Sequence, residues 1–290
     1  MTSPSESLAA DTAMGAVTLR VADLDRLTAY YRDAVTLTLL SVEPARSILG
    51  RGATPIVILE HAPELKHASP RDAGLFHTAI LFETESDLAT AVYSVARTHP
   101  TTFTGSADHL VSKAFYFNDP EGNGIELYWD RARTDWSWTH GRIEMASLRL
   151  DPNAFLASAL DETAVADAAA RPASVGHVHL SVGDVASART FYVDQLGFET
   201  TAEVGGSALF VSAGKYHHHM AMNTWNSAGA GRRQQALGLG LVRIELPSVD
   251  DLGALSERLG FHGVAVEDDG RVLGFADPWA NRIEVAARGR

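Results

Sequence analysis

The sequence contains no cysteine. This absence excludes disulfide bonds, thiolate-bound zinc, cysteine-ligated iron–sulfur clusters and a cysteine nucleophile. Any metal ion that the protein binds must therefore be held by nitrogen and oxygen ligands. The phosphate-binding glycine patterns are also absent, because GLGLVR (Gly238 to Arg243) lacks the third glycine of GxGxxG.

Long apolar runs and an excess of basic residues are missing as well. No run reaches the roughly 18–20 apolar residues of a membrane helix, and the first residues, MTSPSESLAADTA, do not form a basic segment followed by an apolar one. With 24 Lys and Arg against 36 Asp and Glu, the formal net charge is -12, which disfavours binding to a phosphate backbone. The sequence thus predicts a cytoplasmic protein with no nucleic-acid partner and no membrane association.

A repeat divides the 290 residues, a length that suits two domains of ordinary size. VADL at Val21 returns as VGDV at Val182, and YYRDAV returns as FYVDQL at the same displacement of 161 positions. The turn DPEGNGIE at Asp119 returns as DPWANRIE at Asp277, 158 positions later. Two copies of one unit therefore make up most of the chain.

Within each copy the apolar pattern predicts two modules, each with a strand, a helix and further strands. In the first copy we expect strands at 16–21, 55–60, 76–82, 114–117 and 124–128, and helices at 24–32 and 87–97. The expected fold is α+β, with four βαβββ modules that form two tandem domains with curved mixed sheets.

The expected domains are residues 14–130 and 174–288, joined by a linker at 131–173. The linker contains an alanine-rich segment, 154–170, which we expect to be a helix with Asp151 as its N-cap and Pro152 as its first residue. Residues 1–13 are expected to be a disordered tail.

Two histidine–glutamate combinations are candidates for a metal site. His77 and His177 lie early in strands that begin a module, and Glu126 and Glu284 lie in strands that end one. A histidine and a glutamate on one concave sheet face suit a divalent first-row metal, and a second histidine would complete a 2-His-1-carboxylate triad with open positions for substrate and dioxygen. Taken singly, a glutamate at the solvent surface and a hydrogen-bonded structural histidine are the alternatives.

The run YHHHMAMN (Tyr216 to Asn223) supplies further imidazoles. If the run is a strand, His218 shares a face with Met220, while His217 and His219 share the other face. At most one or two of the three can then meet a common metal ion. The alternative is that they are polar strand residues or hydrogen-bond donors to a substrate.

His109 and Tyr116 precede the Asp119 turn. Beside a metal-binding glutamate, this pair could supply the proton donor and the hydrogen bond that ring-opening oxygenation needs. Structural packing of Tyr116 is the alternative.

These motifs resemble the vicinal oxygen chelate superfamily, which includes glyoxalases, fosfomycin-resistance proteins, bleomycin-binding proteins and extradiol dioxygenases. The resemblance covers nearly all of residues 14–287, and its main marks are VGD at Val182 followed by Phe191 and Tyr192, and DPEGNGIE at Asp119. More narrowly, YHHH with Asn223 and Trp225, and ALFVSAG (208–214), are similar to the two-domain catechol-2,3-dioxygenase group of bacteria.

The resemblance implies metal ligands in the first and last strands of the modules. His77 and Glu126 match in the first domain, although Ala16 stands where the family often has a histidine. His177 and Glu284 match in the second domain, although Leu241 stands at the place of its second histidine.

Each ligand set is thus incomplete, and three other residues are candidates to complete one: Glu60 in the first domain, and His218 or His219 in the second. The second domain is the preferred metal site, since it has more nitrogen ligands and two-domain relatives commonly use it. The first domain, however, has His109 and Tyr116, whereas the position equivalent to Tyr116 in the second copy is Gly274.

The resemblance implies a metal-dependent extradiol dioxygenase that acts on a catechol-type diol. The expected cofactor is a divalent metal, Fe(II) first, with Mn(II) or Zn(II) as alternatives. The expected partners are a small aromatic substrate and dioxygen, and a homo-oligomer stays open. Two alternatives are a glyoxalase-like lyase, isomerase or transferase, in which the metal only polarises an oxygen, and a metal-free binding protein of the resistance type.

Overall fold

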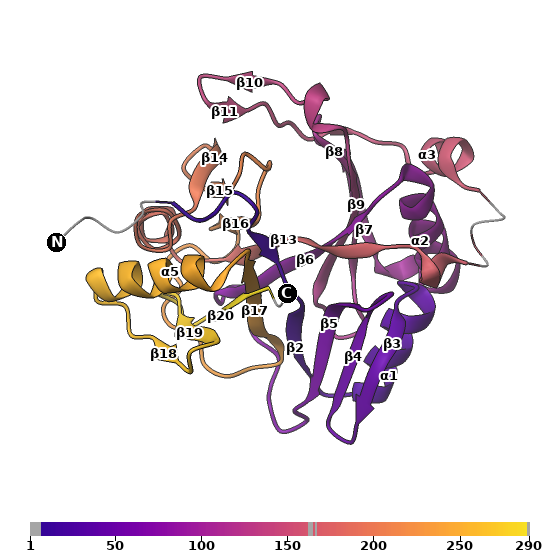
Figure 1. Ribbon diagram of the computed structural model, residues 1–290. Helices are drawn as coiled ribbons and strands as arrows, with labels where there is room; N and C mark the ends of the chain where they lie inside the picture. The colour runs from indigo at the N-terminus through magenta and orange to yellow at the C-terminus, as the bar shows by residue number, and fades with distance from the viewer. Residues whose placement is uncertain (1–6, 162–164, 166, 289–290) are drawn as a thin grey trace. The chain divides into compact units, whose positions relative to one another are not determined.

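The computed structural model describes residues 7–161, 165 and 167–288 (Figure 1). The chain forms two compact units. The N-terminal unit comprises Thr18–Lys66 and His77–Gly176, and the C-terminal unit comprises the described parts of Met1–Val17, His67–Phe76 and His177–Arg290. Each unit contains two βαβββ modules, which confirms the α+β fold with four modules.

The N-terminal unit is built from modules one and two. Module one contains β2 (Val17–Val21), α1 (Leu24–Ala29), the π-helix η1 (Tyr30–Ala34), β3 (Thr38–Glu43), β4 (Arg46–Arg51) and β5 (Thr54–His61). Module two contains β6 (Gly74–Phe82), α2 (Glu85–Thr98), η2 (Pro100–Thr102), β7 (Phe103–Asp108), β8 (Ser112–Asn118) and β9 (Gly124–Asp130). The strand orders are β2-β5-β4-β3 and β6-β9-β8-β7.

The rest of the N-terminal unit follows β9. It contains η3 (Arg133–Asp135), β10 (Trp138–Thr139), β11 (Arg142–Ile143), β12 (Leu148–Arg149), α3 (Pro152–Ala159) and η4 (Ala168–Ala170). Strand β10 pairs with β11 in a hairpin, and β12 pairs with β7.

The C-terminal unit is built from modules three and four. Module three contains β13 (Ala173–Ser181), α4 (Val185–Arg189), η5 (Thr190–Gln195), β14 (Glu199–Val204), β15 (Ala208–Ser212) and β16 (Met220–Asn223). Module four contains β17 (Gly238–Leu246), α5 (Val249–Phe261), β18 (Glu267–Asp268), β19 (Val272–Ala276) and β20 (Arg282–Ala287). Again the first strand of each module lies beside the last, in the orders β13-β16-β15-β14 and β17-β20-β19-β18.

The first and last strands of three modules pair in parallel, namely β6 with β9, β13 with β16 and β17 with β20. The other pairs within these modules are antiparallel. This mixed arrangement brings the start of a module next to its end. A side chain on the first strand can therefore meet one on the last strand, although about 50 residues separate His77 from Glu126 in the sequence.

The repeated aspartate turn stabilises both units in the same way. The buried carboxylate of Asp119 accepts hydrogen bonds from the Tyr31 hydroxyl at 3.1 Å and from the Asn123 side-chain amide at 2.8 Å. In the second copy, Asp277 accepts from the Tyr192 hydroxyl at 2.9 Å and from the Asn281 amide at 2.8 Å. Burial raises the pKa of both carboxyl groups, although these hydrogen bonds oppose the rise. The turns thus tie the helical segment of the first module in each unit to the last strand of the second module.

Helix caps agree with the sequence patterns. Thr84 caps α2 by accepting a hydrogen bond from the Asp87 N–H, and Ser248 caps α5 by accepting one from the Asp251 N–H. The predicted cap of the linker helix is also observed, because Asp151 accepts from the backbone N–H groups of Asn153 and Ala154.

Three expectations about local structure need correction. The linker helix was expected over 154–170 but ends at Ala159, and residues 162–164 and 166 lie outside the described part of the chain. The helix expected over 24–32 is instead a short α-helix continued by the π-helix η1.

Residues 7–13, expected to belong to a disordered tail, are packed in the C-terminal unit. Leu8 is buried, and strand β1 (Ala13–Met14) pairs with β17. The backbone pairing, which the side chains of so short a segment do not reveal, supplies the order. Residues 1–6 lie outside the described part. Among the described residues, no helix is long and apolar enough to span a membrane.

Candidate metal and proton-transfer site

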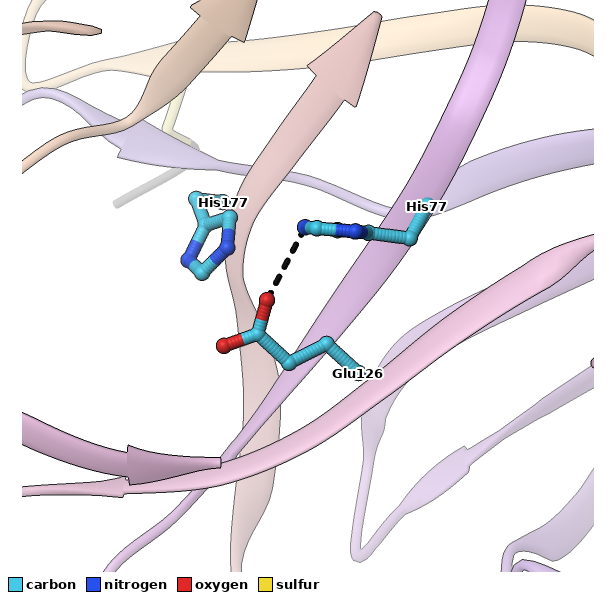
Figure 2. Close-up of side chains that lie close together, drawn as sticks. All are labelled: His77, Glu126 and His177. Atoms are coloured by element: carbon cyan, nitrogen blue, oxygen red, sulfur yellow. Dashed lines mark ion pairs between the residues drawn. The ribbon is translucent and has the colours of Figure 1, made fainter. Parts of the chain in front are cut away.

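A buried histidine–glutamate pair lies in the N-terminal unit. His77 is on β6 and Glu126 is on β9, the strand that pairs with β6 in parallel. His77 Nε2 lies 2.9 Å from Glu126 Oε2, and the two side chains are only 7% and 4% exposed (Figure 2). Glu126 is therefore not a surface glutamate. A carboxylate buried this deeply needs a positive charge or strong hydrogen-bond donors beside it.

Tyr116 on β8 completes a row of polar groups across this sheet. It is the direct cross-strand partner of Glu126, and its ring centroid lies 5.6 Å from that of His77. Burial raises the pKa of the Tyr116 hydroxyl well above its usual range, and the nearby charge of Glu126 adds to the rise. Tyr116 therefore stays protonated at neutral pH and can act as a hydrogen-bond donor.

His109 follows β7 and accompanies Tyr116. Its Nε2 lies 2.7 Å from the Tyr116 hydroxyl, and its Nδ1 lies 2.8 Å from the carbonyl oxygen of Ala146. Four residues singled out in the sequence, His77, His109, Tyr116 and Glu126, thus lie together within one unit. They form a carboxylate–tyrosine–histidine chain beside a second imidazole.

His177 lies on β13 and is the first residue of the last segment of the C-terminal unit. It is 2% exposed, and its ring lies beside those of His218 and His217, at centroid distances of 4.1 and 5.9 Å. The preceding residue, Gly176, is the last of the N-terminal unit. A Cβ at Gly176 would come within 1.7 Å of the Tyr128 hydroxyl oxygen, so only glycine fits at this point.

The three consecutive histidines do not form a strand, because β16 begins only at Met220. The expectation of alternating faces was therefore wrong for this run. His217 Nδ1 and His218 Nδ1 lie 2.8 Å apart, so one of the two rings donates a hydrogen bond to the other. His219 has a different role, since its Nδ1 accepts a hydrogen bond from the Ala213 N–H at 3.2 Å.

The two other carboxylates that the sequence suggested lie in different surroundings. Glu284 on β20 has a side chain that is 30% exposed, and its Oε2 lies 3.6 Å from Arg243 Nη1. Its cross-strand partner is Gly274, in the position that Tyr116 occupies opposite Glu126. Glu60 is on β5, opposite Arg46. Within the described part of the chain, neither glutamate belongs to a group of three donor side chains that could hold a metal ion.

Sequence reasoning missed a second polar pair on β13 and β16. His179 Nε2 lies 3.0 Å from Asn223 Nδ2, and Asn223 Oδ1 accepts a hydrogen bond from the Trp225 N–H. The His179 ring also packs against Phe76 and Trp225, at centroid distances of 4.9 and 5.4 Å. The available signal was the strand period of two, which places His179 on the same face as His177.

Fold and side chains together define a protein of paired βαβββ modules with a buried imidazole–carboxylate pair, a class suited to binding a divalent metal ion. The family model described as Glyoxalase/Bleomycin resistance protein/Dioxygenase superfamily matches residues 13–127 and 174–285. The chain belongs to this superfamily.

Individual relatives agree with this assignment. The chain is 32% identical over 277 residues to a protein of Bacillus subtilis (strain 168) named catechol-2,3-dioxygenase, an alignment that covers 94% of this chain and 96% of the relative. The fold of this chain is similar to that of glyoxalase I from Zea mays in its crystal structure. The TM-score is 0.57, the identity is 17%, and the alignment covers 96% of this chain and 92% of the glyoxalase. It is also similar to the cppA protein of Streptococcus pneumoniae TIGR4, with a TM-score of 0.57, 11% identity and coverage of 99% and 100%.

Proposed function

We propose that the protein is a metal-dependent extradiol dioxygenase that opens the ring of a catechol-type diol. The observation that carries this proposal is the buried His77–Glu126 pair with Tyr116 and His109 beside it. The relative named catechol-2,3-dioxygenase supports the proposal, because the similarity extends over nearly the whole of both chains.

We propose His77 and Glu126 as two ligands of one divalent ion (Figure 2). One imidazole and one carboxylate are two members of the 2-His-1-carboxylate donor set of non-haem Fe(II) oxygenases, and Mn(II) also accepts such ligands. The first copy is preferred to the expected second one, in which the carboxylate of Glu284 already faces Arg243.

The donor set fits such an ion on electrostatic grounds. Both side chains are buried, and a divalent cation would offset the cost of burying the Glu126 charge. Histidine and glutamate offer only nitrogen and oxygen atoms, in agreement with the absence of cysteine. When bound, Fe(II) would act as a Lewis acid toward the two diol oxygens and supply electrons for the reaction with dioxygen.

The residues of the chain have separate roles in this proposal. Glu126 supplies negative charge, and His77 supplies a neutral nitrogen ligand. The Tyr116 hydroxyl, held by His109 at 2.7 Å, donates a hydrogen bond and exchanges a proton with the imidazole.

Oxygen consumption tests this function. Protein loaded with Fe(II) without air and then given catechol and air should consume dioxygen and form a yellow ring-opened product. A protein that binds metal but turns over a dicarbonyl or an epoxide without oxygen uptake would instead be a lyase, isomerase or transferase. A protein that elemental analysis finds free of metal after metal-replete expression would be a binding protein of the resistance type.

A further inference from the structure

The histidine beside Tyr116 is held in one protonation form by a segment outside the βαβββ modules. His109 Nδ1 lies 2.8 Å from the carbonyl oxygen of Ala146. A carbonyl oxygen can only accept a hydrogen bond, so Nδ1 carries the proton of the neutral ring. Nε2 is then the acceptor, and the Tyr116 hydroxyl at 2.7 Å is its donor.

The segment that carries Ala146 is anchored on both sides of His109. We call residues 131–150 the arm. At its start, Arg131 forms a two-pronged ion pair with Asp108, the residue before His109, at 2.7 and 2.9 Å. At its end, β12 pairs with β7, with Leu148 opposite Asp108.

Two further hydrogen bonds stabilise the two ends of the arm. The Trp136 indole N–H donates to the Arg131 carbonyl at 3.0 Å, and the Ser106 hydroxyl on β7 donates to the Leu150 carbonyl at 2.8 Å. The Ala146 carbonyl is therefore held in place by several contacts on either side of it, as a group that positions another residue must be.

The tip of the arm is separate from these anchored ends. It is the β10–β11 hairpin (Figure 1), in which Trp138 pairs with Ile143 across a two-residue turn formed by His140 and Gly141. Both turn residues have positive φ, 51° and 76°, as a type I′ turn requires. The backbone N–H of Glu144 closes the hairpin on the Ser137 carbonyl at 2.9 Å.

The form of His109 decides where the Tyr116 proton points. Tyr116 has one hydroxyl proton and two acceptors within reach, His109 Nε2 and the Glu126 carboxylate. If Nε2 carried the proton of the imidazole, His109 would donate to the Tyr116 oxygen, and the hydroxyl proton would turn to Glu126. That hydrogen bond would withdraw charge from the carboxylate that we propose as a metal ligand.

We propose that the arm is a positioning element for the reaction: the Ala146 carbonyl keeps His109 in the Nδ1–H form, so that the Tyr116 proton is directed to His109 and the charge of Glu126 is left for the metal. This inference rests on the proposed function for its catalytic consequence. The protonation form itself can be measured without any turnover.

Matched insertions test the proposal. In the base variant, two glycines are inserted between Met145 and Ala146 and should displace the Ala146 carbonyl from His109. In the tip variant, which is the control, the same two glycines are inserted between His140 and Gly141 and lengthen only the exposed tip. Melting temperatures of both variants show whether the fold is retained.

The first readout is the nitrogen-15 spectrum of the histidine rings in the full-length Zn(II)-loaded protein, with His109 assigned by its loss in His109→Gln. We expect Nδ1 of His109 to be protonated in the parent and in the tip variant, and a mixture of the two forms in the base variant. Protonation at Nε2 in the parent, or an unchanged His109 spectrum in the base variant, would overturn the proposal.

The second readout is catalysis by the Fe(II)-loaded protein. We expect the base insertion to lower kcat about tenfold with little change in KM, since partial loss of a positioned proton donor costs part of its usual 10²–10⁴-fold contribution. The tip insertion should stay within about twofold of the parent. Equal effects of the two insertions on kcat would contradict the role of the arm, whereas a parent that consumes no oxygen would contradict the proposed dioxygenase function.

Discussion

Replacing the buried glutamate while keeping its shape tests the proposed metal site. In Glu126→Gln, the amide oxygen can still accept a hydrogen bond from His77 Nε2, which lies 2.9 Å from the carboxylate in the parent. The fold should therefore persist. The negative charge and one metal-binding oxygen are lost, and the affinity for Fe(II) or Mn(II) should fall steeply.

The expected size of this fall follows from the position of the residue. Groups that only hydrogen-bond to a metal ligand typically cost 10–100-fold in metal affinity when they are removed. Loss of a ligand itself should exceed about 100-fold, equivalent to about 2.7 kcal/mol or more. Isothermal titration of the metal-free protein with Mn(II), together with elemental analysis after dialysis, measures the change.

Glu284→Gln is the matched control, because Glu284 stands at the equivalent position of the second copy. Its side chain is 30% exposed and faces Arg243, so its replacement should leave metal affinity within about twofold and cost at most about 1 kcal/mol of stability. Unchanged binding in Glu126→Gln, with loss of binding in Glu284→Gln, would refute the assignment and return the site to the second copy.

Three further predictions concern the N-terminal unit. Tyr116→Phe should lower kcat about 10²–10⁴-fold in oxygen-uptake assays with the bound metal retained, and activity equal to that of the parent would exclude proton handling by Tyr116. Gly176→Ala should lower the free energy of unfolding by more than about 2 kcal/mol in urea titrations, because its Cβ would lie 1.7 Å from the Tyr128 hydroxyl oxygen. Asp108→Asn should remove a contribution to the free energy of unfolding that is present at neutral pH and lost in acid. Burial opposes ionisation of Asp108, but hydrogen bonds from Arg131 and the Leu110 N–H outweigh this effect and keep the pKa of Asp108 below its usual range.

The sign of the last effect follows from that lowered pKa. A carboxyl group whose pKa is lower in the folded state contributes stability above its unfolded pKa of about 3.9, and this contribution is lost as the pH falls through the folded value. The difference in unfolding free energy between parent and Asp108→Asn should shrink from pH 6 to pH 2, and a constant difference would contradict it.

For the glycine prediction, Gly253→Ala is the control, because a Cβ at this position in α5 meets nothing within 4 Å. That replacement should stabilise the helix by up to about 1 kcal/mol.

The fold could be predicted from the sequence because the repeat shows the same order of strands, helix and turn twice. A strand and helix that return after 161 positions, and a turn that returns after 158, fixed the number of modules without any knowledge of packing. The parallel pairing of β6 with β9 then made His77 and Glu126 neighbours. Period-two alternation is a local rule, so it worked wherever the chain was a regular strand.

The same rule failed at the histidine run, where the chain is not a strand. His217 and His218 bond to each other, which alternating faces would forbid. The contact between His109 and Ala146 was also beyond prediction, because it joins a side chain to a backbone carbonyl 37 residues away. Contacts of this kind depend on how irregular segments fold back, and composition carries little information about that.

A crystal grown without air from Fe(II)-loaded protein, with anomalous diffraction recorded at the iron edge, tests the central claim most directly. We predict one strong peak about 2.0–2.2 Å from a nitrogen of His77 and an oxygen of Glu126. A peak bound to Glu284 instead, or a crystal in which Glu126 has no iron beside it although iron is present in the protein, would contradict the account.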